Sequence, residues 1–468
     1  MALVPCLAAE GAARFPDRVA IDHAGTAISY RELHQRVTDL TTSLKSQGVG
    51  HGTHLAAIDN TSLTLILLQL SCIRLGAVFA PISPRFPEQQ RQQLLLQIDA
   101  SVIWTAQGKY PGGLPALTLP NTAPAATIDS TPLSDDQAAV SLILTSGSSG
   151  FPKAAMHSLA NHLASASGSA RCIPLQAGDR WLASLPMFHI GGLAILFRCL
   201  GAGATLVLPR QRDLLDTLRE QPVTHLSLVA TQLARILGAD DSSSLMDGLK
   251  VLLLGGGPMP ASLLSQLDTH PVQAFTSYGL TEMASQVTTG PANACGLSGQ
   301  LLPQRQLRIR QGIVEVRGAT RFMGYYQQGQ LQTPFDDDGW FHTKDRGRWT
   351  QGQLEILGRA DNMFISGGEN VQPEEIEAAL KQHPQIQDAL VFPEANPEFG
   401  YLPVAVLHCR ETLPAPSDLD QFLAPRLARF KRPRRYLNWP SGLSQYGLKV
   451  SRLSVARACG LLGPDQDS

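Results

Sequence analysis

The sequence predicts an α/β protein: a large N-terminal domain of mixed and parallel sheets covered by helices, with a β-rich subdomain, then a small α+β C-terminal domain. Three observations lead to this fold class. The chain has 468 residues, roughly three times an average domain of ~150 residues, so two or three domains are expected. Apolar strand-like runs alternate with helix-like stretches, which is typical of parallel sheets covered by helices. After residue 296, short strands punctuated by glycine replace this alternation.

The alternation is visible twice in the first half of the chain. We expect a helix over 30–48, a buried strand over 54–58, a helix over 61–75 and an apolar strand over 77–82. The cycle resumes after a loop rich in Pro, Thr and Ala at 114–132. The later elements are strands over 139–144, 181–185, 205–208, 226–229 and 251–254, and helices that begin at residues 158, 191 and 231.

The C-terminal third has a different texture. Segments such as 312–318 and 353–358 are short strands bounded by glycine, which indicates a β-rich closing subdomain. Beyond residue 361 the sequence predicts a helix at 373–381, strands at 386–391 and 404–407, and a helix at 416–427. We therefore predict two domains, 1–358 and 362–468, with a hinge near 359–361.

Composition limits the class of function. The formal net charge is −1, with 43% hydrophobic and 16% charged residues, which fits a soluble globular protein and argues against nucleic acid as the main partner. The seven cysteines are scattered without a CxxC pair, which suits a reducing compartment rather than disulfides or zinc. The most apolar segment, 63–73, is shorter than the ~20 residues that a membrane span needs. We expect a cytoplasmic enzyme without a membrane span.

A loop rich in serine and glycine follows the strand at 139–144. Residues 145–153 combine two glycines, four hydroxyls and a lysine, so the loop can direct backbone N–H groups and hydroxyls at phosphate oxygens. A flexible turn would explain the same composition equally well. Lys153 follows Pro152, and no Ser or Thr follows it, so a Walker A nucleotide-binding loop is disfavoured.

A second group of motifs lies downstream. Segment 277–282, Ser-Tyr-Gly-Leu-Thr-Glu, offers a ring to stack a base, a hydroxyl for a phosphate and a carboxylate for Mg²⁺. Segments 343–347, 358–361 and 366–377 complete an ordered series. In this order, and over nearly the whole chain, the motifs resemble the adenylate-forming family of acyl-CoA synthetases, luciferases and peptide-synthetase adenylation domains. The resemblance implies ATP, Mg²⁺ and coenzyme A as ligands, and a mobile C-terminal domain.

The family resemblance also implies roles for individual residues of the nucleotide site. The expected roles are pyrophosphate binding by Thr145, Ser146, Gly147, Ser148, Ser149, Gly150 and Lys153; a base pocket at Gly255, Gly256 and Gly257; adenine stacking by Tyr278; an α-phosphate bond from Thr281; Mg²⁺ binding by Glu282; ribose binding by Asp345; a ribose or phosphate contact by Arg359; and a hinge at Asp361. The family's usual Thr-Gly-Asp reads Thr-Lys-Asp here, with Lys344 in the glycine position.

Lys449 is the predicted catalytic lysine. Segment 446–452 resembles the family's Gly-Lys-x-x-Arg ending, with Leu448 inserted between the glycine and the lysine. The resemblance implies that Lys449 bridges the attacking carboxylate and the α-phosphate, where charge spreads in the transition state. The alternative is a solvated surface lysine. The basic run 430–435 is interpreted as a solvated face or as part of the coenzyme A approach.

The acid-binding side is less defined. His189 lies in a Pro-x-Phe-His-x-x-Gly segment, which in the family separates the acyl pocket from the thiol tunnel, although a lone histidine is more often structural. Arg198 lies in an apolar helix, 193–200, where an unpaired charge is costly. It is therefore either paired internally or faces an anionic substrate, and the sequence leaves both open.

Several segments resemble one branch of the family, the o-succinylbenzoate–CoA ligases of menaquinone biosynthesis. They are 182–186, 226–233, 364–369 and 398–400. The substrate of that branch carries two carboxylates, one activated and one that needs a cationic or polar partner. By motif adjacency, the candidate partners are Arg198, Thr231 and Arg235.

Three alternatives stay open. An aryl- or medium-chain-acyl–CoA ligase would use the same chemistry. A peptide-synthetase-type enzyme would act on a carrier protein, but no carrier domain with its serine follows Arg452. A non-catalytic nucleotide-binding regulator is disfavoured, because Lys449, Glu282 and Asp345 are all present. The sequence does not predict the oligomeric state.

Overall fold

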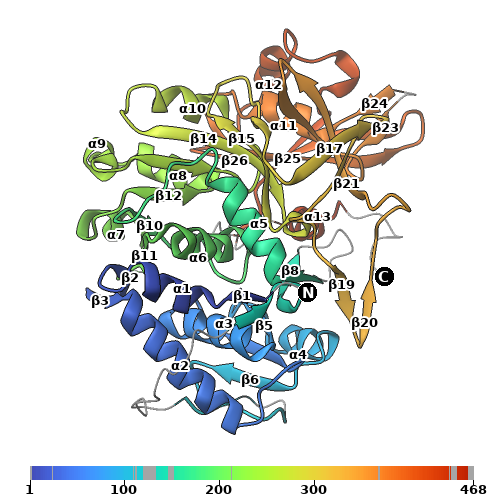
Figure 1. The fold of residues 1–468 in the computed structure, drawn as a ribbon. Coiled ribbons are helices and arrows are strands. Elements are labelled where there is room, and N and C mark those ends of the chain that lie inside the picture. Colours follow the sequence, from blue (N-terminus) through green and yellow to red (C-terminus); the bar gives the residue numbers. More distant parts are fainter. Residues whose placement is uncertain are drawn as a thin grey trace.

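The computed structural model describes residues 3–23, 25–108, 110, 113–119, 133–145, 152–211, 213–366, 369–441, 443 and 451–461. These residues form sheets of two, nine, four, seven and five strands, with helices packed against the large sheets (Figure 1). The predicted α/β class is confirmed.

The seven-stranded sheet carries the loop that precedes Lys153. Its centre is parallel, whereas the strands on the β9 side are antiparallel hairpins. In spatial order the strands are β20 (Gln330–Gln332), β19 (Gly324–Gln327), β9 (Lys153–Ser158), β8 (Ala139–Thr145), β5 (Val78–Ile82), β4 (His54–Ile58) and β6 (Val102–Thr105).

The nine-stranded sheet carries most of the predicted base and metal residues. It is parallel from β14 to β2 and antiparallel at both edges. In spatial order the strands are β16 (Gln300–Leu301), β15 (Ser285–Pro291), β14 (Gln273–Leu280), β13 (Val251–Leu254), β12 (His225–Leu228), β10 (Arg180–Leu182), β11 (Thr205–Val207), β2 (Val19–His23) and β3 (Thr26–Ser29).

Helices between the two large sheets build the main core, in which Phe79 of one sheet and Trp181 of the other are both fully buried. The first helix after β3 starts at a capping box, in which Ser29 and Glu32 bond each other's backbone N–H. The helices of this layer are α1 (Leu7–Arg14), α2 (Tyr30–Ser46), α3 (Leu63–Leu75), α5 (Leu159–Ser169) and α6 (Ile190–Ala202). The peripheral helices are α4 (Glu88–Gln97), α7 (Leu214–Glu220), α8 (Ala230–Leu237), α9 (Ser242–Met246) and α10 (Ala261–Leu267).

The β-rich subdomain is an antiparallel sheet of β17 (Arg305–Arg310), β18 (Ile313–Gly318), β21 (Phe341–Thr350) and β22 (Gln353–Arg359). A turn, η1 (Thr281–Met283), follows β14, and the N-terminal β1 (Leu3–Pro5) pairs with β7 (Leu133–Asp135).

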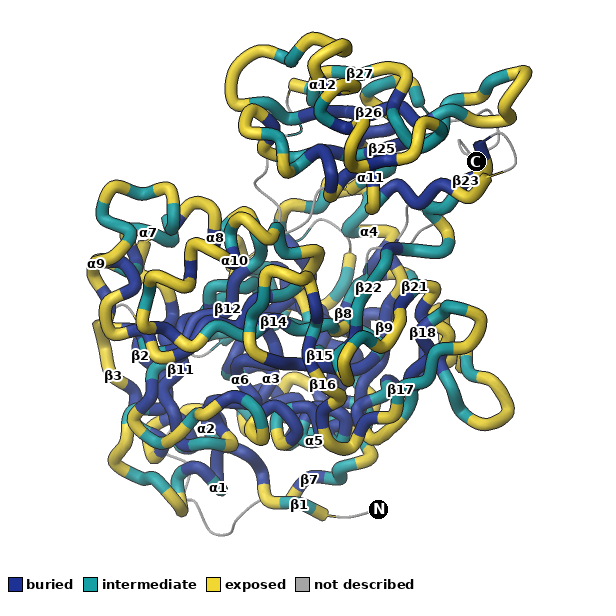
Figure 2. The backbone as a smooth tube through the Cα atoms, turned by 90° about the horizontal axis from the view of Figure 1, so that it is seen from above, coloured by how far each residue is buried: buried dark blue, intermediate teal, exposed yellow. Residues whose placement is uncertain are grey.

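The chain after β22 forms a separate sheet with its own apolar core (Figure 2). The strands are β23 (Phe364–Ser366), β24 (Glu369–Val371), β25 (Ile386–Asn396), β26 (Gly400–Cys409) and β27 (Arg435–Asn438). The helical segments are α11 (Pro373–Leu380), α12 (Pro416–Leu423), η2 (Arg429–Lys431) and α13 (Arg452–Ala458). The exact boundary at 359–361 stays a prediction.

Most predicted elements are present, with shifted ends. The strand expected over 181–185 is β10, which ends at Leu182, and the helix expected over 416–427 is α12, which ends at Leu423. The four elements before Tyr30 were not predicted, because β1, β2 and β3 are too short to give a clear periodicity. In the described part of the chain, no helix is long and apolar enough to cross a membrane.

Candidate active site

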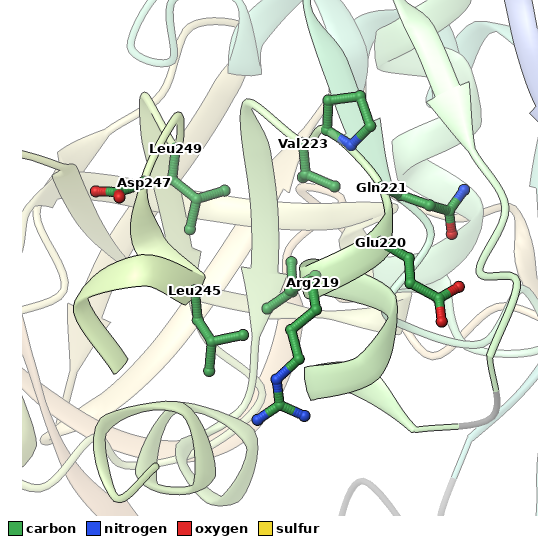
Figure 3. Close-up of a pocket in the computed structure, with 9 residues that line it drawn as sticks. Arg219, Glu220, Gln221, Val223, Leu245, Asp247 and Leu249 are labelled. Atoms are coloured by element: carbon green, nitrogen blue, oxygen red, sulfur yellow. The ribbon is translucent and has the colours of Figure 1, made fainter. Parts of the chain in front are cut away.

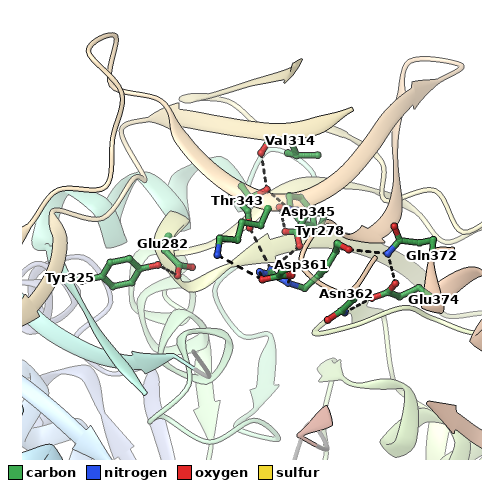
Figure 4. Close-up of polar contacts among 12 residues, drawn as sticks. Tyr278, Glu282, Val314, Tyr325, Thr343, Asp345, Asp361, Asn362, Gln372 and Glu374 are labelled. Carbon is green, nitrogen blue, oxygen red and sulfur yellow. Dashed lines mark hydrogen bonds and ion pairs between the residues drawn. The ribbon is translucent and has the colours of Figure 1, made fainter. Parts of the chain in front are cut away.

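Three predicted site residues from different strands form one bonded group (Figure 4). The hydroxyl of Tyr278, on β14, donates to Oδ2 of Asp345, on β21, at 2.6 Å. Arg359, at the end of β22, donates from Nη1 to Oδ1 of Asp345 at 3.0 Å. It also donates to the two carboxylate oxygens of Asp361, from Nε at 2.9 Å and from Nη2 at 3.0 Å. The structure thus brings together the residues expected at adenine, at ribose and at the hinge.

Electrostatics follow from this bonding. Burial, then the adjacent Asp345 carboxylate, raises the pKa of Tyr278, so the phenol stays a hydrogen-bond donor. Burial alone would lower the pKa of Arg359, but its bonds with Asp361 and Asp345 outweigh that cost and raise the pKa. Burial would raise the pKa of Asp361, but its bonds with the Arg359 guanidinium outweigh that cost and lower the pKa, so Asp361 stays charged.

Glu282 forms a second group with a residue that the motifs did not predict. Its Oε1 accepts a hydrogen bond of 2.5 Å from the hydroxyl of Tyr325, on β19. The Nζ atom of Lys153 lies 4.9 Å from the centroid of the same tyrosine ring. Burial raises the pKa of Glu282, and the Tyr325 bond opposes this shift. Sequence signals for Tyr325 were limited to the Gly-Tyr-Tyr run at 324–326.

Thr281 and the glycine segment flank this group. The carbonyl of Thr281 accepts a hydrogen bond from Nε2 of the fully buried His157 at 2.7 Å. Gly255 follows β13, which pairs in parallel with β14. A Cβ added at Gly255 would lie 2.9 Å from Oγ of Ser277, next to Tyr278 in the chain. The loop 255–257 therefore lies close to the strand that carries Tyr278, and a side chain at Gly255 would require the Ser277 hydroxyl to move.

Lys344 explains why the family places glycine at this position. Its φ is 64°, in the left-handed region that side chains disfavour. Its carbonyl accepts from the N–H of Ala360 at 2.7 Å, and its Nζ lies 3.9 Å from Oδ2 of Asp361. The departure from Thr-Gly-Asp thus adds a second cation beside Asp361, the predicted hinge residue.

Arg198 is buried, with 5% of its surface exposed. Its Nη2 donates to Oε1 of Gln286 at 2.8 Å and to Oγ of Ser285 at 3.1 Å, and its guanidinium lies 5.4 Å from the ring centroid of Trp181. Burial, then the nearby Arg305, lowers its pKa to about 10, so it remains charged at neutral pH. Among the described residues no carboxylate pairs with it.

The other acid-side candidates are placed differently. His189 precedes α6 and stacks edge-on against Phe188 at 4.9 Å. Its side chain reaches solvent but is enclosed by protein on most sides, and this burial, then Arg85, lowers its pKa. Thr231 is exposed on α8, and exposed Arg235 bonds Asp213 at 2.5 Å. Within the described part of the chain, no hydrogen bond or ion pair joins Thr231 or Arg235 to Arg198.

Other predicted residues lie outside the described ranges: Ser146, Gly147, Ser148, Ser149, Gly150 and Lys449. The ends of both segments are described. Thr145 pairs with Lys153 across the β8–β9 hairpin. Three residues after Lys449, Arg452 bonds Glu377 and the carbonyl of Val391.

A cavity of about 240 Å³ lies away from these groups, beside α7 and α9 (Figure 3). Its rim includes Arg219 and Gln221. Arg219 is held by Asp241 at 2.8 Å and by Asp216 at 2.8 Å, so its charge is compensated locally. None of the predicted site residues lines this cavity.

Comparison with known proteins identifies the family. The AMP-binding enzyme profile matches residues 8–326, and that of the AMP-binding enzyme C-terminal domain matches residues 375–441. The 2-succinylbenzoate–CoA ligase of Escherichia coli strain K12 is 39% identical over 436 residues, covering 92% of both chains. The Haemophilus influenzae enzyme of the same name is 34% identical over 449 residues, covering 94% of this chain and 95% of the relative.

Solved structures agree with the sequence comparison. An arginine-to-lysine variant of E. coli MenE with bound OSB-AMS superposes with a TM-score of 0.86 at 34% identity, covering 98% of both chains. MenE from Bacillus subtilis, in complex with ATP and magnesium ion, gives a TM-score of 0.84 at 26% identity, covering 93% of this chain and 96% of the other. Because the family profile covers residues 8–326 and the relatives match over nearly their whole length, the chain belongs to the AMP-binding, adenylate-forming enzyme family.

Proposed function

We propose that this chain ligates 2-succinylbenzoate to coenzyme A through an acyl-adenylate, with ATP as the energy source and AMP and pyrophosphate as products. It is an AMP-forming acid–thiol ligase that acts in menaquinone biosynthesis. The named relatives support this activity, and they match more than nine-tenths of the chain.

The environment of Arg198 is the observation that supports 2-succinylbenzoate as the acid substrate. A buried guanidinium without a carboxylate partner among the described residues is costly, because desolvation of a charge needs compensation. A monocarboxylic acid uses its one carboxylate in adenylation. A dicarboxylic acid retains a second carboxylate that can pair with Arg198, so this site favours 2-succinylbenzoate over benzoate or octanoate.

The site geometry supports the following roles on the nucleotide side. Tyr278 stacks on the adenine, Asp345 and Arg359 hold the ribose, and Thr281 donates to the α-phosphate. Thr145 and Lys153, which pair across the β8–β9 hairpin, bind the pyrophosphate. Gly255, Gly256 and Gly257 border the base. For Lys449, which lies outside the described residues, the family motif supports the role of stabilising the charge that develops during adenylation.

Glu282 fits the Mg²⁺ ion that the family implies. It is a half-buried carboxylate that accepts a hydrogen bond from the neutral phenol of Tyr325. Magnesium in phosphate-transferring enzymes is often held by one or two carboxylates and substrate phosphates. When bound, the ion would neutralise phosphate charge as pyrophosphate leaves. Glu282 would orient it, and Tyr325 would fix the carboxylate.

Coenzyme A is the second substrate, and His189 is placed between its thiol and the acyl group. The domain boundary lies at 359–361, with Asp361 as the hinge residue. All seven cysteines are free thiols, which supports a reducing, cytoplasmic location.

The assay that tests this function is ATP–pyrophosphate exchange driven by a panel of acids. Succinylbenzoate should support exchange far better than benzoate or octanoate. Thioester formation with coenzyme A, measured as the release of AMP, should show the same preference among the acids. Equal exchange with octanoate would contradict the assignment and favour a medium-chain-acyl–CoA ligase.

The variant Arg198→Met tests whether Arg198 binds the second carboxylate of the acid. Methionine is apolar and unbranched, and replacing a buried charge with an apolar group of similar volume is often tolerated by the fold. The KM for succinylbenzoate should rise at least about 10-fold, the size of one lost charged bond. The affinity for ATP without acid, and the thermal midpoint, should stay close to wild type. An unchanged KM would return Arg198 to a structural role.

A further inference from the structure

Gln286 lies between two buried arginines. Its Oε1 accepts from Nη2 of Arg198 at 2.8 Å, and its backbone carbonyl accepts from Nε of Arg305 at 2.7 Å. Its amide nitrogen donates to Oγ1 of Thr289 at 2.6 Å, which fixes which end of the amide faces Arg198. Gln286 is 3% exposed and Arg305 is 4% exposed. The position of the Arg198 guanidinium therefore depends on Gln286.

The turn before Gln286 is both strained and anchored. Ala284 has φ 50° and Ser285 has φ 114°, conformations that residues with a side chain rarely adopt. Strained backbone persists only when its surroundings over-determine it. Here four carbonyls of the turn 281–286 accept bonds from other elements: Thr281 from His157 at 2.7 Å, Glu282 from the N–H of Phe322 at 2.8 Å, Ala284 from Ser165 at 2.6 Å and Gln286 from Arg305 at 2.7 Å.

The two ends of this anchored turn contact different side chains. Thr281 and Glu282 lie at its start, where Glu282 contacts Tyr325. Ser285 and Gln286 lie at its end, where both contact Arg198. We propose that the turn 281–286 couples recognition of the second carboxylate of the acid at Arg198 to the placement of Thr281 and Glu282 against ATP, with Gln286 and His157 as positioning residues. The inference rests on the function proposed above.

The physical reason is shared ordering. An anion at Arg198 compensates a buried charge whose Nε has no partner among the described residues. The bound anion thereby strengthens the Arg198–Gln286 contact and orders the turn 281–286, of which Gln286 is the last residue. When nucleotide then binds, the turn is already ordered, so nucleotide binding costs less conformational entropy. The two ligands are therefore positively coupled. Couplings of this kind change affinity about 5–150-fold, and the change must be equal in both directions.

The test measures binding of Mg²⁺·α,β-methylene-ATP, which cannot release pyrophosphate, with and without saturating succinylbenzoate or benzoate. In wild type, succinylbenzoate should tighten nucleotide binding at least about fivefold, and benzoate should not. Gln286→Leu, similar in size but without the amide oxygen, should reduce the factor toward one and leave nucleotide affinity without acid nearly unchanged. Gln221→Leu is the matched control: Gln221 is also 3% exposed but lies at the peripheral cavity, and this variant should keep the full coupling.

His157 keeps the proposal testable if Gln286→Leu fails to fold. His157→Gln can still donate to the carbonyl of Thr281 and should retain coupling, whereas His157→Leu should lose it without changing the affinity for acid alone. Independent binding of acid and nucleotide to wild type, or equal coupling in both His157 variants, would overturn this inference and leave the ligase function standing. Failure of wild type to bind succinylbenzoate at all would overturn both.

Discussion

The hydroxyl of Tyr278 donates to Oδ2 of Asp345 at 2.6 Å, so the side chain expected at adenine is bonded to the one expected at ribose. Asp345 accepts from Arg359 on its other oxygen. The carboxylate therefore has a fixed orientation before nucleotide binds. Such preorganisation lowers the ordering cost of binding.

Tyr278→Phe isolates this bond. The ring that stacks is kept, but Asp345 loses one partner. A hydrogen bond to a charged group contributes about 1.5–3 kcal/mol, so we expect the KM for ATP to rise about 10-fold or more in pyrophosphate exchange, while the KM for the acid changes little. Tyr326→Phe, which removes a surface tyrosine bond to Asp99, is the control. Unchanged ATP kinetics in Tyr278→Phe would mean that Asp345 needs no help from the phenol.

Glu282 should make magnesium use pH-dependent. Its pKa is raised by burial, so protonation competes with Mg²⁺ above the ordinary range of glutamate. Apparent Mg²⁺ affinity should therefore fall as pH decreases toward this raised pKa. Tyr325→Phe removes a bond that lowers the pKa, and should move the midpoint of this profile to higher pH. Mg²⁺ titrations of adenylation between pH 5 and pH 8 measure the shift; a midpoint that moves downward would contradict this account.

The same carboxylate has a stability consequence. Because the folded-state pKa is raised, the contribution of Glu282 to stability is present below the unfolded pKa and is lost as pH rises through the folded pKa. Glu282→Gln should therefore unfold at higher temperature than wild type at neutral pH without ligand, although it should not adenylate. The two proteins should converge in acid.

Lys344 offers a test of backbone strain. A side chain in the left-handed region costs about 1–2 kcal/mol. Glycine removes this strain, but its greater freedom in the unfolded chain lowers the stability again by part of that amount. Lys344→Gly should be more stable than Lys344→Ala by about 0.5–1 kcal/mol in urea unfolding. Both variants lose the same charge near Asp361, so their difference isolates the backbone. Equal stabilities would show that the surrounding strands relieve the strain.

Lys449 should be required for only one of the two steps. Adenylation alone brings the carboxylate and α-phosphate oxygens together, so only that step has charge for the ammonium group to stabilise. Lys449→Ala should slow pyrophosphate release by on the order of 10² or more. It should still convert supplied acyl-adenylate and coenzyme A to thioester at near the wild-type rate.

Single-turnover measurements of each half-reaction check this prediction. Lys45→Ala is a suitable control, because Lys45 is exposed near the end of α2, whereas Lys344 contacts the predicted hinge. Normal adenylation by Lys449→Ala would place the catalytic lysine elsewhere.

Sequence reasoning predicted the fold class and the residues that short motifs contain. Tyr278 and Glu282 occur in one motif, and the family resemblance predicts Asp345 and Arg359. Tyr325 was missed because it reaches Glu282 from a hairpin 43 residues away. Gln286 was missed for a related reason: its role depends on which arginines pack on either side, and no local pattern specifies that.

The Glu282–Tyr325 bond also joins the two large sheets, because Glu282 follows β14 of the nine-stranded sheet and Tyr325 lies on β19 of the seven-stranded one. The carboxylate proposed to hold the metal therefore adds a cross-link between the two layers, beside the bond from His157 of β9 to the carbonyl of Thr281. Local opening is governed by such cooperative units. When nucleotide and Mg²⁺ occupy the site, amide hydrogen exchange should slow in both β14 and β19. The two strands, one from each sheet, would then open as one cooperative unit.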